Sequence, residues 1–136
     1  AAVESFDVHA LLGPLGCDMR LAAQLHFSGG ATSQFVCGFD GVADNSFHIA
    51  GERGHITVHS GFWQATEAAL HMACEPALNA QAPFACNGFE YQIEEVHRCL
   101  AQGQLESAVM PWRESLAVVE LMDAMRQRIG LRYPFE

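Results

Sequence analysis

The sequence contains no lysine, and its seven basic residues are all arginines. The absence of Lys excludes Schiff-base catalysis and any mechanism that needs a lysine proton donor. The formal net charge of −9 repels phosphate backbones, and no cluster of arginines with interleaved aromatic residues offsets it. We therefore expect no nucleic-acid partner.

Long apolar runs are also absent, since none approaches the roughly 20 residues that a membrane helix requires. No basic segment with a cleavage site opens the chain, so the sequence predicts neither a signal peptide nor a membrane partner. The five cysteines have wide spacings and no Cys-x-x-Cys pair, which argues against a disulfide framework or a zinc knuckle. We expect free thiols in a reducing cytoplasm. The cysteines are Cys17, Cys37, Cys74, Cys86 and Cys99.

The first two thirds of the chain alternate between apolar and polar residues with a period of two, which is typical of strands. Two hairpins are predicted, one turning at Ser28–Gly30 and the other between Gly51 and Gly54. Further strands are expected within residues 3–12 and 66–73. The residues expected to face the core are Leu21, Ala23, Leu25, Phe27, Phe35, Cys37, Phe39, Phe47, Ile49, Ile56 and Val58.

The last third changes to a helical period. Residues 87–103 predict a helix with Asn87 as its cap, Glu90 completing a capping box and Gly103 at its end. A second helix is expected from Pro111 to Gly130, with Asp123 and Arg126 paired on its surface. The apolar positions expected to face the core are Phe89, Ile93, Val96 and Leu100 in the first helix, and Leu116, Val119, Met122, Met125 and Ile129 in the second.

Strands followed by helices predict an α+β fold. With 136 residues, half of them apolar, the chain is long enough for one domain. We expect a mostly antiparallel sheet of about six strands with the helices packed on one face, and the open face used for dimerisation. No repeat or linker divides residues 1–136.

Strand parity defines this open face. Across the four hairpin strands it is predicted to carry no Lys, Arg, Asp or Glu, and six of the seven histidines lie on it. A face without charges is typical of an interface core, although a solvated polar face remains the alternative. The expected homo-oligomer contacts are His26, Gln34, His48, His55, Thr57 and His59, and His9 and His71 share their parity.

No group of residues predicts a catalytic or metal site. His55 and His59 stand roughly 13 Å apart on a strand, too far to share one ion. His48 and His55 lie closer across two strands, but no third ligand is evident. The pair Glu94 and His97 occurs once, whereas di-iron helices need two such motifs. Asp7 and His9 share a strand face, and Ser60 and Ser107 lie in no nucleophile motif. We therefore assign no catalytic, cofactor-binding or metal residue.

Several segments of the chain together resemble the C-terminal domain of the glucose-fructose oxidoreductase / inositol dehydrogenase / MocA family, in its dihydrodiol- and xylose-dehydrogenase branch. The matching segments are 16–35, 47–63, 90–99, Gly103, Met110-Pro111, 114–116, Met122-Asp123, Arg126 and Gly130–Pro134. The resemblance implies an NAD(P)-dependent oxidoreductase whose N-terminal Rossmann domain binds the cofactor and supplies a catalytic Lys. It also implies that the open sheet face makes the dimer.

The departures from that family are as informative as the matches. The sequence has no Rossmann half, no glycine-rich phosphate turn and no Lys, so no catalytic residue is carried over. Asp18 lies where the family often has Gly-Val-Asp, but receives no catalytic role. The resemblance thus implies a substrate-binding and dimerisation domain that is inactive alone and binds no cofactor itself, NAD or NADP being implied for the full-length enzyme. Two alternatives stay open: a free-standing ligand-binding or assembly module, and a small metal-dependent enzyme using the histidine face.

Overall fold

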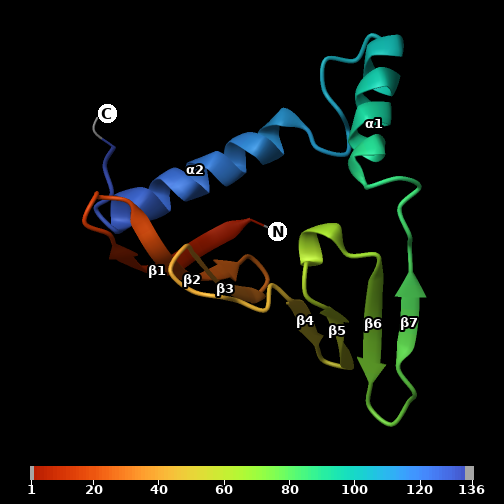
Figure 1. Cartoon of the computed structure of the whole chain (residues 1–136), viewed down its shortest axis with the longest axis horizontal. Helices are drawn as coiled ribbons and strands as arrows, with labels where there is room; N and C mark the ends of the chain where they lie inside the picture. The colour runs from red at the N-terminus through yellow and green to blue at the C-terminus, as the bar shows by residue number, and fades with distance from the viewer. Residues whose placement is uncertain (1, 134–136) are drawn as a thin grey trace. The chain divides into compact units, whose positions relative to one another are not determined.

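The computed structural model describes residues 2–133, so Pro134 of the resemblance lies outside the described residues. Its elements follow the predicted order of strands, then helices (Figure 1). Among the described residues, neither helix is long and apolar enough to cross a membrane. The elements are β1 Val3–Leu12, β2 Asp18–Phe27, β3 Thr32–Gly38, β4 Phe47–Gly51, β5 Gly54–Val58, the short 3-10 helix η1 Phe62–Gln64, β6 Glu67–Met72, β7 Leu78–Gln81, α1 Phe89–Ala101 and α2 Trp112–Arg128.

The strands form two antiparallel sheets, one of order β1-β2-β3 and one of order β4-β5-β6-β7. This confirms the α+β class, but the prediction of about six strands in a single sheet is not confirmed. Strand β7 was not predicted, because its four residues are too short to show a period. The chain divides into two compact units, residues 1–41 with 108–136 and residues 42–107, and each is described by itself.

Strand β2 of the three-stranded sheet follows the predicted parity, whereas Phe35, Cys37 and Phe39, also predicted to face the core, are exposed. Val8, Ala23 and Leu25 are buried together on one face, and Leu21 and Phe27 pack against them. The Ser28–Gly30 turn is confirmed, since Phe27 N–H donates to the Ala31 carbonyl across it at 2.8 Å. The core of this unit therefore lies on the odd-numbered side of β2.

Helix α2 completes that core with part of the predicted stripe, Met125 and Ile129, and with Leu121, which was not predicted. Met125 is buried, and Leu121 and Ile129 pack beside it. The predicted positions Leu116, Val119 and Met122 are more than half exposed. Helix α2 carries apolar residues on more than one side, so the period alone did not show which side would face the sheet.

Both helices end as predicted, at a glycine with positive φ. Gly103 follows α1, and Gly130 follows α2. In each case the glycine and the residue after it donate N–H groups back to the last turn of the helix. Gly103 donates to Leu100 at 3.1 Å and Gln104 to Cys99 at 2.9 Å, and Gly130 donates to Gln127 at 3.2 Å and Leu131 to Arg126 at 3.0 Å. This is the Schellman arrangement, which satisfies carbonyls that the helix leaves open.

The four-stranded sheet contains the second predicted hairpin. Strands β4 and β5 are joined by Glu52 and Arg53, with Gly51 paired to Gly54. Gly54 is required by close packing, because a Cβ there would collide with the His71 carbonyl oxygen of β6. Helix α1 follows β7 (Figure 1), and its Ile93, Val96 and Leu100 are more than half exposed.

Candidate functional site

The polar face of the three-stranded sheet carries paired amides and histidines. Gln24 lies directly opposite Gln34 on β3 and opposite Asp7 on β1. His26 Nε2 lies 3.8 Å from an Asp7 carboxylate oxygen, which makes an ion pair when the imidazole is protonated. A shallow hollow on this sheet is lined in part by Asp7, His9, Gln24 and Gln34. Asp7 and His9, which share a strand face, both line this hollow, and the side-chain contact of Asp7 is with His26.

This face is not free of charges, contrary to the prediction. Strand β2 begins at Asp18, two residues before the run from which the face was assigned, and Arg20 shares the parity of Gln24 and His26. The Arg20 guanidinium donates to both carboxylate oxygens of Asp40, at 3.0 and 2.8 Å. Hydrogen bonding to Arg20 lowers the pKa of Asp40, so both side chains stay charged and their opposite charges offset each other.

The four-stranded sheet carries the other histidines on one face. Pairing register puts His48 opposite Thr57, and His55 opposite His71. The His48 ring nitrogen Nδ1 lies 3.4 Å from the Thr57 hydroxyl. The rings of His55 and His71 stack, with centroids 4.6 Å apart and planes inclined by 13°. His59 lies just beyond the end of β5, outside the sheet.

The predicted dimer-contact residues differ in how much of their surface is exposed. His48, His55, His59 and Gln34 are exposed, and the His26 side chain is partly exposed. Thr57 is only 8% exposed, so it has little surface left to offer a partner. The predicted histidine contacts therefore remain available on each sheet, while Thr57 acts within its own sheet by holding His48.

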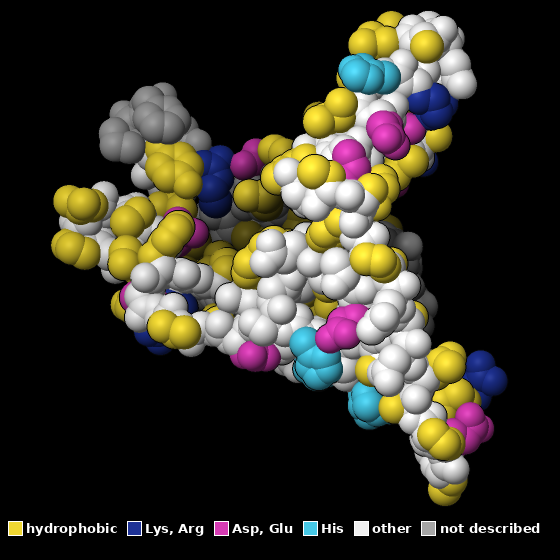
Figure 2. All heavy atoms as spheres, turned by 45° about the vertical axis from the view of Figure 1, so that its right-hand side comes forward, with side chains coloured by type: hydrophobic (Ala, Val, Ile, Leu, Met, Phe, Trp, Pro, Cys, Tyr) yellow, Lys and Arg dark blue, Asp and Glu magenta, His cyan; other side chains and the backbone are white. Residues whose placement is uncertain are grey.

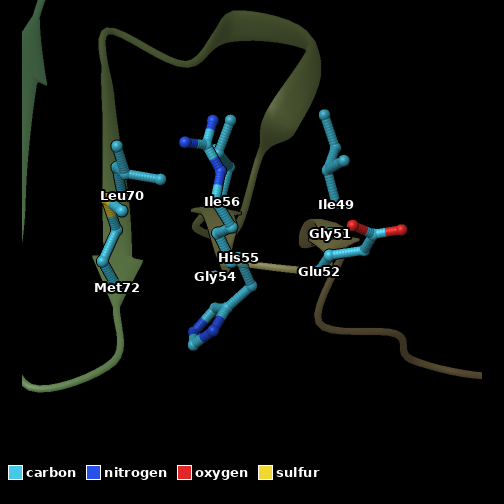
Figure 3. A pocket seen from close by; sticks show the side chains of 9 residues that line it. Ile49, Gly51, Glu52, Gly54, His55, Ile56, Leu70 and Met72 are labelled. Atoms are coloured by element: carbon cyan, nitrogen blue, oxygen red, sulfur yellow. The ribbon is translucent and has the colours of Figure 1, made fainter.

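The opposite face of the four-stranded sheet is apolar. Ile49, Ile56 and Leu70 line an open groove beside the β4–β5 turn. Figure 3 shows Ile49 and Ile56 extending to one side while His55 points to the other. Figure 2 shows hydrophobic side chains exposed over much of the surface in view. The two faces of this sheet therefore differ sharply in chemistry.

One carboxylate accepts hydrogen bonds from the backbone N–H groups just before α1. Glu90 accepts N–H bonds from Cys86, Asn87 and Gly88 at 2.7, 3.1 and 2.7 Å. Burial acts to raise the pKa of Glu90, but these backbone donors outweigh it and hold the pKa below its ordinary value. The predicted capping box is thus partly confirmed: Glu90 reaches back as expected, but Gly88 is the cap residue, and Asn87 instead accepts from Phe89 N–H at 3.1 Å.

The C-terminal half of α1 holds an ionic cluster that the sequence did not predict. Both Glu95 carboxylate oxygens accept from Arg98 at 2.7 Å, and Ser107 donates its hydroxyl to the same group. The Arg98 guanidinium and the Ser107 hydroxyl lower the pKa of Glu95 to about 2. Burial raises the pKa of the adjacent Cys99 thiol, so it stays protonated. This cluster anchors the segment after α1, and it gives Ser107 a structural partner.

The other residues considered for metal binding or catalysis form no further site in the described structure. Glu94 and His97 both lie exposed on α1, and Ser60 is exposed after β5. Within residues 2–133, no group of three or more His, Cys, Asp or Glu side chains is placed to hold a metal ion. The described structure thus defines an α+β protein of antiparallel sheets with open polar faces.

The chain is similar in sequence to several known dehydrogenases. Trans-1,2-dihydrobenzene-1,2-diol dehydrogenase of Macaca fuscata fuscata is 26% identical over 124 residues, covering 88% of this chain and 37% of that enzyme. The Homo sapiens enzyme of that name is 25% identical, with the same coverage. D-xylose 1-dehydrogenase (NADP(+)) of Hypocrea jecorina is 40% identical over 48 residues, 35% of this chain and 12% of that enzyme. No family model matches the chain.

A solved structure supports the fold. The aldose-aldose oxidoreductase of Caulobacter crescentus, complexed with glycerol, aligns with a TM-score of 0.78 and 16% sequence identity over 95% of this chain and 39% of that one. The predicted resemblance to the glucose-fructose oxidoreductase / inositol dehydrogenase / MocA family, in its dihydrodiol- and xylose-dehydrogenase branch, is confirmed. The chain spans about 37% of the length of the diol dehydrogenases it matches.

Proposed function

We propose that this chain is the substrate-binding and dimerisation domain of an NAD(P)-dependent oxidoreductase that acts on a sugar or diol carbinol by hydride transfer. The observation that carries the proposal is the match of 88% of the chain to 37% of diol dehydrogenases. In such an enzyme the protein positions the carbinol carbon against the nicotinamide and supplies an acid or base. We place the cofactor outside this chain.

The described residues do not fit a dinucleotide. A pyrophosphate is normally held by backbone N–H groups at a helix N-terminus behind a glycine-rich turn. At α1 the Glu90 carboxylate accepts from the N–H groups just before the helix, those of Cys86, Asn87 and Gly88, and its negative charge would repel a phosphate. At α2 the helix follows Met110-Pro111, and no glycine-rich turn precedes it. The glycine turns at Gly29-Gly30 and Gly51–Gly54 join antiparallel strands, with no helix following.

We assign the dimerisation role to the open polar faces of the sheets. Their central positions hold Gln24, Gln34, His48 and His55, whose amide and imidazole groups can hydrogen-bond to the same groups of a second copy. Beside them, Arg20 pairs with Asp40, and an Asp7 carboxylate oxygen lies 3.8 Å from His26 Nε2. Such a surface is suited to an isologous contact, in which the same patch serves both subunits.

Calorimetric titration of the purified chain with NADH and with NADPH tests the placement of the cofactor. We expect no binding at micromolar ligand, because neither helix follows a glycine-rich turn and Glu90 places a negative charge at the start of α1. A matched variant, Glu90→Gln, removes the carboxylate charge but leaves the helix without a glycine-rich turn, so it too should bind neither. Micromolar binding of either nucleotide by the unaltered chain would overturn the proposal.

A further inference from the structure

The bend before α1 contains the only Asn-Gly pair in the sequence, Asn87-Gly88. An asparagine followed by glycine loses its amide group readily, because glycine has no side chain to hinder attack by its own backbone nitrogen. Asn87 is exposed, and the pair lies outside the helix, which begins at Phe89. The other two asparagines, Asn45 and Asn79, are followed by serine and alanine, and Asn79 is held within β7. Asn87 is therefore the asparagine most open to this reaction.

The local geometry brings the two reacting groups together. The Asn87 side-chain oxygen accepts a hydrogen bond from the Phe89 backbone N–H at 3.1 Å. This bond folds the side chain back along the Gly88 peptide unit, as in other turns of this kind. Attack of the Gly88 nitrogen on the Asn87 amide carbon then closes a five-membered ring and requires rotation only within Asn87.

The Glu90 carboxylate opposes the attack. Its Oε2 atom accepts N–H bonds from Gly88 at 2.7 Å and from Asn87 at 3.1 Å. The Gly88 nitrogen becomes a nucleophile only after it loses its proton, and the resulting anion would lie beside the negative carboxylate. Burial acts to raise the pKa of Glu90, but its backbone donors hold the pKa below the ordinary value, so the carboxylate is charged at neutral pH.

We propose that Asn87 is a site of deamidation and that the Glu90 carboxylate slows the reaction in the folded chain. The Gly88 nitrogen bonds to the Asn87 amide carbon, and the bond from that carbon to the side-chain nitrogen breaks. The departing nitrogen takes up the proton that Gly88 gave up and leaves as ammonia. Water then opens the cyclic imide at one of its two carbonyls, giving aspartate or isoaspartate.

Either product changes the start of α1. Aspartate adds a second negative charge beside Glu90. Isoaspartate lengthens the backbone by one carbon between two N–H groups that Glu90 binds at once, those of Asn87 and Gly88. Both products should therefore weaken the contacts that hold the bend to the helix. The proposal does not depend on the oxidoreductase assignment.

Peptide mapping by mass spectrometry, during incubation of the purified chain at mildly alkaline pH, tests the proposal. Glu90→Gln should raise the rate of deamidation at Asn87 about fivefold, the factor expected for two unit charges about 4 Å apart in water. Glutamine keeps an oxygen that can accept the Gly88 N–H, so this variant isolates the charge. The matched control, Glu94→Gln, removes an exposed charge one turn further along α1 and should leave the rate unchanged.

The same measurement in concentrated urea keeps the test independent of how well the variant folds. There the wild-type chain should deamidate at Asn87 faster than in buffer, and at the same rate as Glu90→Gln, because unfolding separates Glu90 from the Gly88 N–H. Circular dichroism confirms that the variant is folded in buffer. The proposal is overturned by a wild-type rate in buffer that equals the rate in urea, by a folded Glu90→Gln chain that keeps the wild-type rate, or by an Asn87 that stays intact in urea.

Discussion

Met125 and Met122 provide a matched test of which side of α2 faces the sheet. Met125 is 5% exposed and packs with Val8, Ala23 and Leu25, whereas Met122, three residues away, is 58% exposed. Truncation of a buried Met to Ala removes its transfer free energy and leaves a cavity, at a cost of about 2–5 kcal/mol. We expect about 2–3 kcal/mol for Met125→Ala, because only one helix covers this sheet face and the site can partly collapse. Met122→Ala should change stability by no more than about 0.5 kcal/mol.

Urea unfolding followed by circular dichroism measures the difference. With a slope of about 2 kcal/mol per molar urea, Met125→Ala should lower the midpoint by about 1 M, while Met122→Ala leaves it nearly unchanged. The slope itself should stay the same in both variants, since neither alters the overall surface exposed on unfolding. Equal losses for the two variants, or a larger loss for Met122→Ala, would refute the assignment of the buried stripe.

Further predictions concern close packing and acid stability. Gly54→Ala should destabilise the chain by about 1–3 kcal/mol, because the new Cβ meets the His71 carbonyl, whereas Gly41→Ala, in open space, should be nearly neutral in the same urea assay. Glu95→Gln should lose stability near pH 6. Because the Glu95 pKa is lowered in the folded chain from 4.5 to about 2, the wild-type advantage is complete above pH 4.5 and disappears as pH falls toward 2. A constant difference in unfolding midpoint across that range would contradict the role of the Glu95–Arg98 pair.

Local structure was predictable from the sequence where the backbone conformation or a fixed spacing requires a particular residue type. Gly103 and Gly130 end their helices because the positive φ after a helix favours glycine, and both positions were identified. The Ser28–Gly30 turn and the alternation in β2 likewise follow from local chemistry. The Asp123–Arg126 pair, at 2.8 Å, needed only helical spacing.

Long-range arrangements were not predictable from these patterns. Helix α2 has apolar residues on two sides, and only packing against β1 and β2 selects Leu121, Met125 and Ile129. Register across strands decided that His55 meets His71, since parity fixes the face of a side chain but not its cross-strand neighbour. The same limit hid the Glu95 cluster, in which Ser107 returns to α1 from twelve residues further along the chain.

Sedimentation equilibrium of the purified chain at pH 8 tests the central claim most directly. We expect a dimer at micromolar concentration, and Gln34→Arg, which puts an unpaired charge at the middle of the three-stranded sheet's polar face, should shift it to monomer. Association should also weaken at pH 5, where protonated His48 and His55 place like charges in the contact. A chain that is monomeric at pH 8, or a dimer indifferent both to Gln34→Arg and to pH, would contradict the account.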